Sequence, residues 1–313
     1  MPEHFPRPET PESALEKRLN LRAQYAVALK SLNETGVLEI LPDKDALGIA
    51  GIDGVEYPLP SYESIKTKLL ESEAWLSEKL DQGFTELTLV PIAMPIATLA
   101  KRVERELKVK HKEGELTSPG NPPTSLELDT ENPLYLWDQF KGADESGELK
   151  YFPKQFSKDN HHGLTKQELI TQTNDTSFPG FIVTLSEPTE IPSQGKGKTL
   201  AGRPQLETNH TPNDYLETLE NPRYAHEQGE TIEGWMARLL RHLHEKGEVI
   251  DDYQGTGKLN YLTGNYHPAS GYVPVGGWYR VSRQTGVYRS TPGDRSDRDG
   301  SRSAVRVGLD FGD

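Results

Sequence analysis

Apolar residues recur at helical spacing in several parts of the chain, most clearly between residues 231 and 246. One face of this segment carries Ile232, Trp235, Met236, Leu239, Leu240 and Leu243. This spacing predicts an amphipathic helix. Thr231 can cap its first turn, and Gly247 is suited to end it, because glycine readily adopts the left-handed conformation that follows a helix.

Weaker patterns predict the remaining elements. We expect further helices at 13–33, 61–82, 95–109 and 164–172, and one that Thr211 caps with Pro212 in its first turn. Apolar or alternating runs predict strands at 37–41, 85–92, 134–137, 149–152, 180–185 and 303–309. Asp53-Gly54 predicts a hairpin turn, and the Pro-rich residues 1–12 predict a loose arm. The pattern indicates an α+β protein.

Composition limits the classes of function. The net charge of −13 argues against nonspecific nucleic-acid or membrane binding. The absence of cysteine excludes disulfides, a thiol nucleophile and cysteine-based zinc sites. No apolar run is long enough to span a membrane, and Met1–Pro8 lacks the apolar part of a signal peptide. We therefore expect neither segment, and the sequence leaves the cytoplasm, the cell surface and a virion open as locations.

The carboxyl-terminal segment 259–313 differs in composition from the rest of the chain. It contains no Lys, Glu or Ile, but it is rich in Tyr, Ser, Gly, Asp, Thr and Arg. Tyrosine gives rigid contact area, and small polar residues give adaptable hydrogen bonds, so this composition is typical of binding surfaces. Glycines and Pro292 interrupt the segment too often for a long regular strand, and we expect the side chains between them to stand in solvent.

Candidate catalytic residues are few. Asp251 and Asp252 follow a short strand-like run, and His267 comes shortly after them. Paired carboxylates with a histidine could serve a hydrolase as acid and base. An enzyme that uses these residues is one alternative to a binding protein. An assembly protein whose tail packs against itself is another. We expect no cofactor and no metal.

Several motifs near the carboxyl end resemble one known family. They are Asp251-Asp252-Tyr253-Gln254-Gly255, His267-Pro268-Ala269-Ser270-Gly271, Trp278-x-Arg280-Val281-x-Arg283 and Arg302-Ser303-Ala304-Val305-Arg306. The string is similar to the carboxyl end of variable proteins, which are the targets of diversity-generating retroelements in archaea and small-genome bacteria. The match is best over residues 205–313. It implies a C-type-lectin-like domain over 176–313, preceded by an α+β accessory region over 1–175 that could serve as a mount for assembly.

The resemblance also implies a variable region at about 276–302, rewritten by mutagenesis at adenines. Such changes in Asn codons give Tyr, Ser, Asp, Gly, Thr and Arg but not Lys, Glu or Trp, in agreement with the composition of the tail. The residues implied to be diversified are Gly277, Tyr279, Ser282, Thr285, Tyr288, Ser290, Thr291, Asp294, Ser296, Asp297, Arg298 and Asp299. Those implied to be scaffold are Trp278, Arg280, Arg283, Arg289, Arg302 and Arg306.

This reading predicts a non-enzymatic binding protein. Its ligand would be a protein or a cell-surface molecule that differs between variants, and its oligomeric state is left open. Arg280, Arg283, Arg302 and Arg306 are expected to hold loop carbonyls, because a guanidinium offers five fixed donors. The helix at 231–246 and the buried face of the last strand are expected to carry the stability of the domain.

Overall fold

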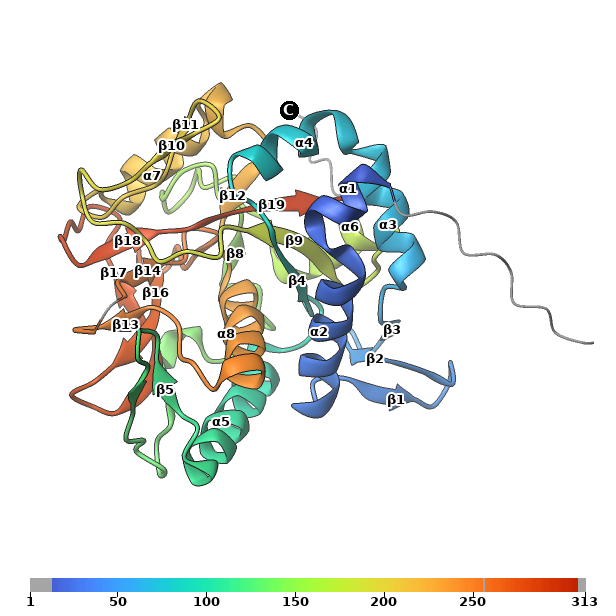
Figure 1. Cartoon of the computed structure of the whole chain (residues 1–313), viewed down its shortest axis with the longest axis horizontal. Coiled ribbons are helices and arrows are strands. Elements are labelled where there is room, and N and C mark those ends of the chain that lie inside the picture. Colours follow the sequence, from blue (N-terminus) through green and yellow to red (C-terminus); the bar gives the residue numbers. More distant parts are fainter. Residues whose placement is uncertain (1–12, 256, 309–313) are drawn as a thin grey trace, which may run out of the picture.

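The computed structural model describes residues 13–255 and 257–308 (Figure 1). The predicted arm at 1–12 and the end of the last predicted strand at Leu309 lie outside this range. The described part of the chain is mixed α+β, with 32% of the described residues in helices and 24% in strands.

A four-stranded antiparallel sheet lies near the middle of the molecule. Its order is β12 (Glu227–Gly229), β19 (Ser303–Val307), β9 (Ile182–Ser186) and β4 (Glu86–Val90). Val307 of β19 is the register partner of Val183 of β9. The last described strand therefore returns to pair with a strand that lies more than a hundred residues earlier.

Three helices pack together beside this sheet: α2 (Leu21–Glu34), α5 (Ile96–Glu113) and α8 (Ile232–Lys246). Thr231 caps α8 through a hydrogen bond that Gly234 N donates to its hydroxyl, and Gly247 ends the helix with φ of 67°. The clearest helix prediction is thus confirmed. Figure 1 shows α8 between α2 and the strands β13 to β17.

The second main sheet has six strands and lies on the other side of α8 (Figure 1). Its order is β18 (Asp299–Ser301), β14 (Leu259–Tyr261), β16 (Val273–Tyr279), β17 (Gln284–Ser290) and β7 (Leu134–Leu136), with β13 (Asp252–Tyr253) also paired to β16. β16 and β17 form a hairpin of seven residues on each side. The expectation that the tail holds no long strand is therefore wrong.

Aromatic rings fill the space next to two glycines of this hairpin, one ring from α8 and one from β17 itself. A Cβ added to Gly276 would lie 2.6 Å from Cε2 of Trp235, so the ring of α8 occupies the space that a side chain would need. One added to Gly286 would lie 2.1 Å from Cε2 of Tyr288. Glycine weakens isolated strands, but here close packing over the glycines compensates.

Two predicted helices are each broken in two. The segment 13–33 forms α1 (Ala14–Leu19) and α2, separated by Asn20 in the left-handed conformation. The segment 61–82 forms α3 (Tyr62–Glu71) and α4 (Glu73–Asp81), separated by Ser72. Apolar spacing continues across both breaks, and for that reason the sequence pattern did not reveal them.

The remaining elements are short. They are the helices α6 (Lys166–Asn174) and α7 (Pro212–Leu219), the 3₁₀ turns η1 (Asp138–Phe140) and η2 (Pro222–Tyr224), and the strands β1 (Glu39–Leu41), β2 (Ala46–Ala50), β3 (Glu56–Pro58), β5 (Thr117–Ser118), β6 (Thr124–Ser125), β8 (Lys150–Tyr151), β10 (Thr199–Leu200), β11 (Arg203–Pro204) and β15 (Asn265–Tyr266). The Asp53-Gly54 turn joins β2 to β3 as predicted. Thr211 caps α7 with Pro212 in its first turn, also as predicted.

The predicted boundary at residue 175 does not divide the core. One hydrophobic cluster contains Leu89 and Val103 from the first region as well as Trp235 and Val305 from the second. β4 belongs to the same sheet as β9 and β19, and β7 extends the hairpin sheet at β17. The region before this boundary therefore supplies strands to both main sheets rather than forming a separate unit.

Glu86 on β4 is bound by two side chains of α8. His242 Nε2 lies 2.8 Å from Glu86 Oε1, and Arg241 Nε lies 3.9 Å from the same oxygen. Burial alone would raise the pKa of Glu86, but the hydrogen bond and charge of His242 and the charges of Arg238 and Arg241 lower it to about 2. The ionised carboxylate thus stabilises the contact between sheet and helix.

We predict an acid-sensitive contribution from Glu86. A lowered pKa adds stability that is present above the ordinary carboxyl pKa and is lost as the pH falls from about 4.5 to about 2. Glu86→Gln should cost roughly 3 kcal/mol at neutral pH and flatten the pH dependence in that window. Urea unfolding at a series of pH values measures both effects, with the exposed Glu131→Gln as the control. If the free energy of unfolding of Glu86→Gln falls with pH as steeply as that of the unsubstituted protein in this window, the assignment is wrong.

Candidate functional site

Successive side chains of the hairpin β16–β17 point to opposite faces of the sheet. Trp278 is 1% exposed and faces the core, where its register partner Thr285 is also buried. Tyr279 and Tyr288 lie on the other face and are half-buried. One face of the hairpin therefore packs in the main core. The other packs partly on a second apolar cluster, which contains Leu259 and Val275, and is partly open to solvent at the two tyrosines.

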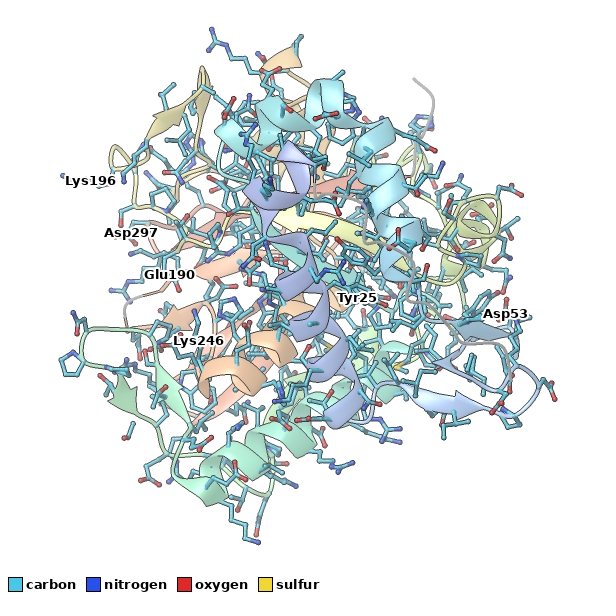
Figure 2. All side chains as sticks on the ribbon, turned by 45° about the vertical axis from the view of Figure 1, so that its right-hand side comes forward. Tyr25, Asp53, Glu190, Lys196, Lys246 and Asp297 are labelled. Carbon is cyan, nitrogen blue, oxygen red and sulfur yellow. The ribbon has the colours of Figure 1, made fainter. Side chains whose placement is uncertain are left out.

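Most of the residues implied to be diversified lie at the surface. Exposed or half-buried are Tyr279, Ser282, Tyr288, Ser290, Thr291, Asp294, Ser296, Asp297, Arg298 and Asp299. Figure 2 shows Asp297 at one edge of the molecule, on the side opposite to Asp53. Gly277 and Thr285 are buried, and for these two the expectation of a solvent-facing position is wrong.

The local geometry explains both exceptions. A Cβ added to Gly277 would lie 2.4 Å from Cδ2 of Leu259 and 2.9 Å from the carbonyl oxygen of Asp251. Any side chain at this position requires the neighbouring strand to move. Thr285 shares the inward face with Trp278, so its side chain does not reach a ligand.

Backbone contacts hold the loop between β17 and β18. Asn209 N donates to the carbonyl of Ser296 at 2.9 Å, and Asn213 N donates to that of Pro292 at 3.1 Å. Asp294 accepts a hydrogen bond from Thr291 N at 2.9 Å, and this bond lowers the pKa of Asp294. The two contacts with the α7 segment do not depend on which side chains the loop carries.

The arginines implied to be scaffold take different roles. Arg302 donates to the carbonyl of Thr189 and to Asp251 Oδ1 at 2.8 Å, so the predicted binding of a loop carbonyl is found there. Arg280 instead binds a carboxylate, Asp252 Oδ2, at 2.6 Å.

Two further scaffold arginines lie over rings. The guanidinium of Arg306 is 3.9 Å from the ring centroid of Phe152, and that of Arg289 is 4.3 Å from the ring centroid of Tyr272. The side chain of Arg283 is exposed, and the backbone carbonyl of Arg283 accepts a hydrogen bond from Asp129 N. The carboxylate bound by Arg280 and the ring beneath Arg306 thus differ from the expected binding of loop carbonyls, and Arg283 takes part through its own backbone carbonyl.

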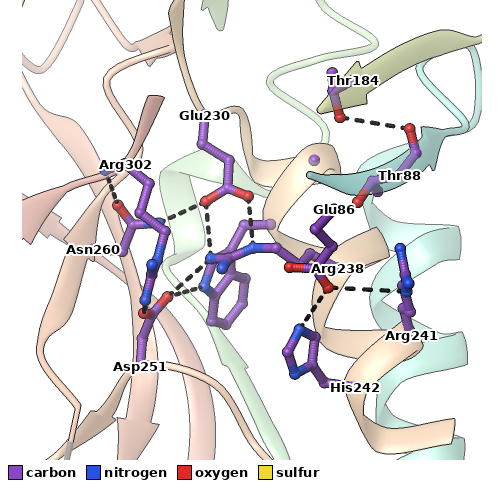
Figure 3. A network of polar contacts seen from close by, with 12 residues as sticks. Glu86, Thr88, Thr184, Glu230, Arg238, Arg241, His242, Asp251, Asn260 and Arg302 are labelled. Atoms are coloured by element: carbon purple, nitrogen blue, oxygen red, sulfur yellow. Dashed lines mark hydrogen bonds and ion pairs between the residues drawn. The ribbon is translucent and has the colours of Figure 1, made fainter. Parts of the chain in front are cut away.

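Asp251 lies at the centre of a buried network beneath the hairpin (Figure 3). Its Oδ2 accepts from Trp235 Nε1 at 2.9 Å and from Arg238 at 3.4 Å, and its Oδ1 accepts from Arg302. Glu230 accepts hydrogen bonds from Nε of Arg238 at 3.0 Å and from Nη2, the nitrogen that also binds Asp251, at 3.2 Å; burial raises the pKa of Glu230. The network joins α8 to the segment that follows β18.

The structure does not assemble the alternative catalytic group. Asp251 and Asp252 are fully buried in ion pairs with arginines. His267 Nδ1 lies 2.8 Å from Ser270 Oγ, its ring packs against Trp137 and Phe140, and burial lowers its pKa. No hydrogen bond or ion pair joins this histidine to either aspartate within residues 13–255 and 257–308.

Two surface tyrosines outside the implied variable region were missed in the sequence. Tyr253 on β13 packs against Tyr279, with ring centroids 5.7 Å apart, and Tyr135 on β7 stacks on Tyr288 at 4.5 Å. Two features of the sequence could have pointed to these tyrosines. Tyr253 belongs to the motif Asp251-Asp252-Tyr253-Gln254-Gly255, and Tyr135 alternates with two leucines. Their place beside the hairpin depends on strand pairing across long stretches of chain.

Within the described residues, no group of three or more metal-binding side chains comes together. None of the helices in that part of the chain has the length and apolar character needed to cross a membrane. No protein-family model, no curated protein and no solved structure matches the chain.

We predict that Asp251 is a structural residue. Asp251→Asn removes the charge shared by Arg238 and Arg302, which keep Glu230 and Glu190 as charged partners, and should destabilise the fold by about 2–3 kcal/mol. The side chain of Asp297 is 84% exposed, so Asp297→Asn should change stability by about 0.5 kcal/mol or less. Chemical denaturation measures the free energy of unfolding of both variants. If Asp251→Asn loses no more stability than Asp297→Asn, the network does not stabilise the fold.

Proposed function

We propose that the protein is a non-enzymatic binding protein with a hypervariable surface near its carboxyl end. In this proposal it is a variable protein of a diversity-generating retroelement. The ligand is a protein or a cell-surface molecule whose identity depends on the variant. The proposal joins the motif resemblance of the sequence to the geometry of the hairpin and of the loop that follows it.

The observation that carries the proposal is the separation of two residue sets. Ten of the twelve residues implied to be diversified are exposed or half-buried, whereas the scaffold residues Trp278, Arg302 and Arg306 are buried. The other scaffold arginines lie nearer the surface: Arg280 is half-buried, and Arg283 and Arg289 are exposed. Surface substitutions usually change stability by about 0.5 kcal/mol or less, while buried ones cost more. A chain organised in this way tolerates many sequences at one site.

The order of elements supports a C-type-lectin-like scaffold in the carboxyl-terminal half. β9 and β19 pair as the first and last strands of this half, the helices α7 and α8 lie between them in sequence, and β14, β16 and β17 form a separate sheet. In that fold the last strand pairs with the first, and the chain between them forms a second sheet. The inserted strands β4 and β7 are additions to it.

The neighbouring DNA tests the function directly. We expect a near-copy of the codons for residues 276–302 close to a reverse-transcriptase gene, differing from the coding copy only at adenines. The differences should fall on the surface codons named above and should spare those of Trp278 and Arg302. A complete genome that lacks such a copy would remove the retroelement from this proposal.

We further predict that the surface side chains are dispensable for folding. The combined variant Tyr279→Ser, Tyr288→Ser and Asp294→Asn should remain folded and lose about 2 kcal/mol or less. Trp278→Ala removes a buried ring and should cost about 3–5 kcal/mol. Thermal unfolding followed by circular dichroism compares the variants. If the triple variant is unfolded while Trp278→Ala still melts cooperatively, the surface belongs to the core and the proposal fails.

A further inference from the structure

Four tyrosines lie side by side across four neighbouring strands of the six-stranded sheet. This tyrosine row consists of Tyr253 on β13, Tyr279 on β16, Tyr288 on β17 and Tyr135 on β7. Successive ring centroids are 5.7, 4.2 and 4.5 Å apart. All four side chains are half-buried, so each ring keeps part of its surface in solvent.

The strand register places the rings in contact. Tyr253 and Tyr279 are direct partners in the parallel pair β13–β16. Gly286 of β17 is the partner of Tyr135, and the ring of Tyr288 lies over Gly286 where a side chain would otherwise stand. The ring of Tyr288 thereby bridges from Tyr135 on one side to Tyr279 on the other. A residue with a side chain at position 286 would separate the rings.

Polar partners hold two of the four rings, Tyr288 inside the row and Tyr253 at one end. Gln284 Nε2 donates to the hydroxyl of Tyr288 at 2.8 Å. Arg298 donates to the hydroxyl of Tyr253 at 3.2 Å, and its guanidinium lies 5.9 Å from that ring centroid. Held rings lose little conformational entropy when a ligand binds, and this is the property that makes tyrosine effective in binding surfaces.

The row crosses the border of the implied variable region. Tyr279 and Tyr288 lie inside residues 276–302, whereas Tyr253 precedes this region and Tyr135 comes from the first half of the chain. We propose that Tyr253 and Tyr135 are constant contact residues that flank the variable ones in a single protein-binding surface. This inference rests on the proposed function and adds that the region 1–175 takes part in the site through Tyr135.

The geometry favours a folded protein as the partner. Adjacent strands lie about 4.8 Å apart, so the row is roughly 14 Å wide. Because the rings contact one another, they leave no slot between them for a small aromatic ligand. A ligand must lie across the row, as the surface of a protein does. Tyrosine and arginine are also the residues that contribute most to protein interfaces.

A display experiment with a defined probe tests the inference. The full chain is randomised at Ser282, Ser290, Thr291, Ser296 and Asp297, and clones are selected for binding to immobilised lysozyme. Several independent clones then receive Tyr135→Ala or Tyr253→Ala. We expect each substitution to weaken lysozyme binding at least about tenfold in clones of different sequence. Tyr25→Ala, on α2 beyond α8, is the matched control and should leave affinity within about twofold.

Footprinting gives a second measurement that needs no substitution. In the selected clones, lysozyme should protect Tyr135 and Tyr253 from hydroxyl-radical modification and leave Tyr25 reactive. Clones that bind lysozyme but show neither the loss of affinity nor the protection would overturn the inference and leave the proposed function standing. A failure to select any clone from the library would count against the proposed function itself.

Discussion

The buried carboxylate of Asp251 is the interaction on which the candidate surface depends. It accepts hydrogen bonds from Trp235 and Arg238 of α8 and from Arg302, and its backbone carbonyl accepts one from Trp278 N. One residue thus ties the hairpin β16–β17 and the chain after β18 to the central helix. A charge with no exposure is stabilising only when its partners are complete, and here they come from two separate segments, α8 and the chain after β18. The network therefore fixes the position of the hairpin more strictly than apolar packing alone would.

This arrangement is compatible with the variable surface of the proposed function. The side chains that carry the network and the core, such as Trp278 and Arg302, alternate with or flank those that face solvent. The loop that follows β17 is attached to the α7 segment by hydrogen bonds to its carbonyls at Pro292 and Ser296, which every residue type provides. Under the proposed function, the backbone atoms that hold this segment differ from the side-chain atoms that would contact a ligand. Gly277 is the exception among the residues implied to be diversified, since a side chain at its position would require Leu259 and the backbone at Asp251 to shift.

The sequence predicted what local pattern and capping determine. α7 and α8 were placed correctly because Thr211 and Thr231 are strong caps and the apolar spacing is regular. The hairpin was missed because glycine disfavours strands locally, and the ring of Trp235 that fills the space over Gly276 lies about forty residues earlier. The partners of Asp251 and the pairing of β7 with β17 are likewise nonlocal, so neither the network nor the place of Tyr135 follows from spacing. The breaks at Asn20 and Ser72 interrupt helices without interrupting their apolar faces.

The role of the region 1–175 follows from the sheets that it completes. β7 pairs with β17 and covers what would otherwise be an exposed edge of the hairpin sheet, and unpaired edges invite association with other chains. β4 does the same for β9 in the four-stranded sheet. A mount for assembly could be removed without changing the hairpin, but removal of these strands would expose both edges. The first region therefore acts as part of the frame, and through Tyr135 it reaches the edge of the candidate binding surface.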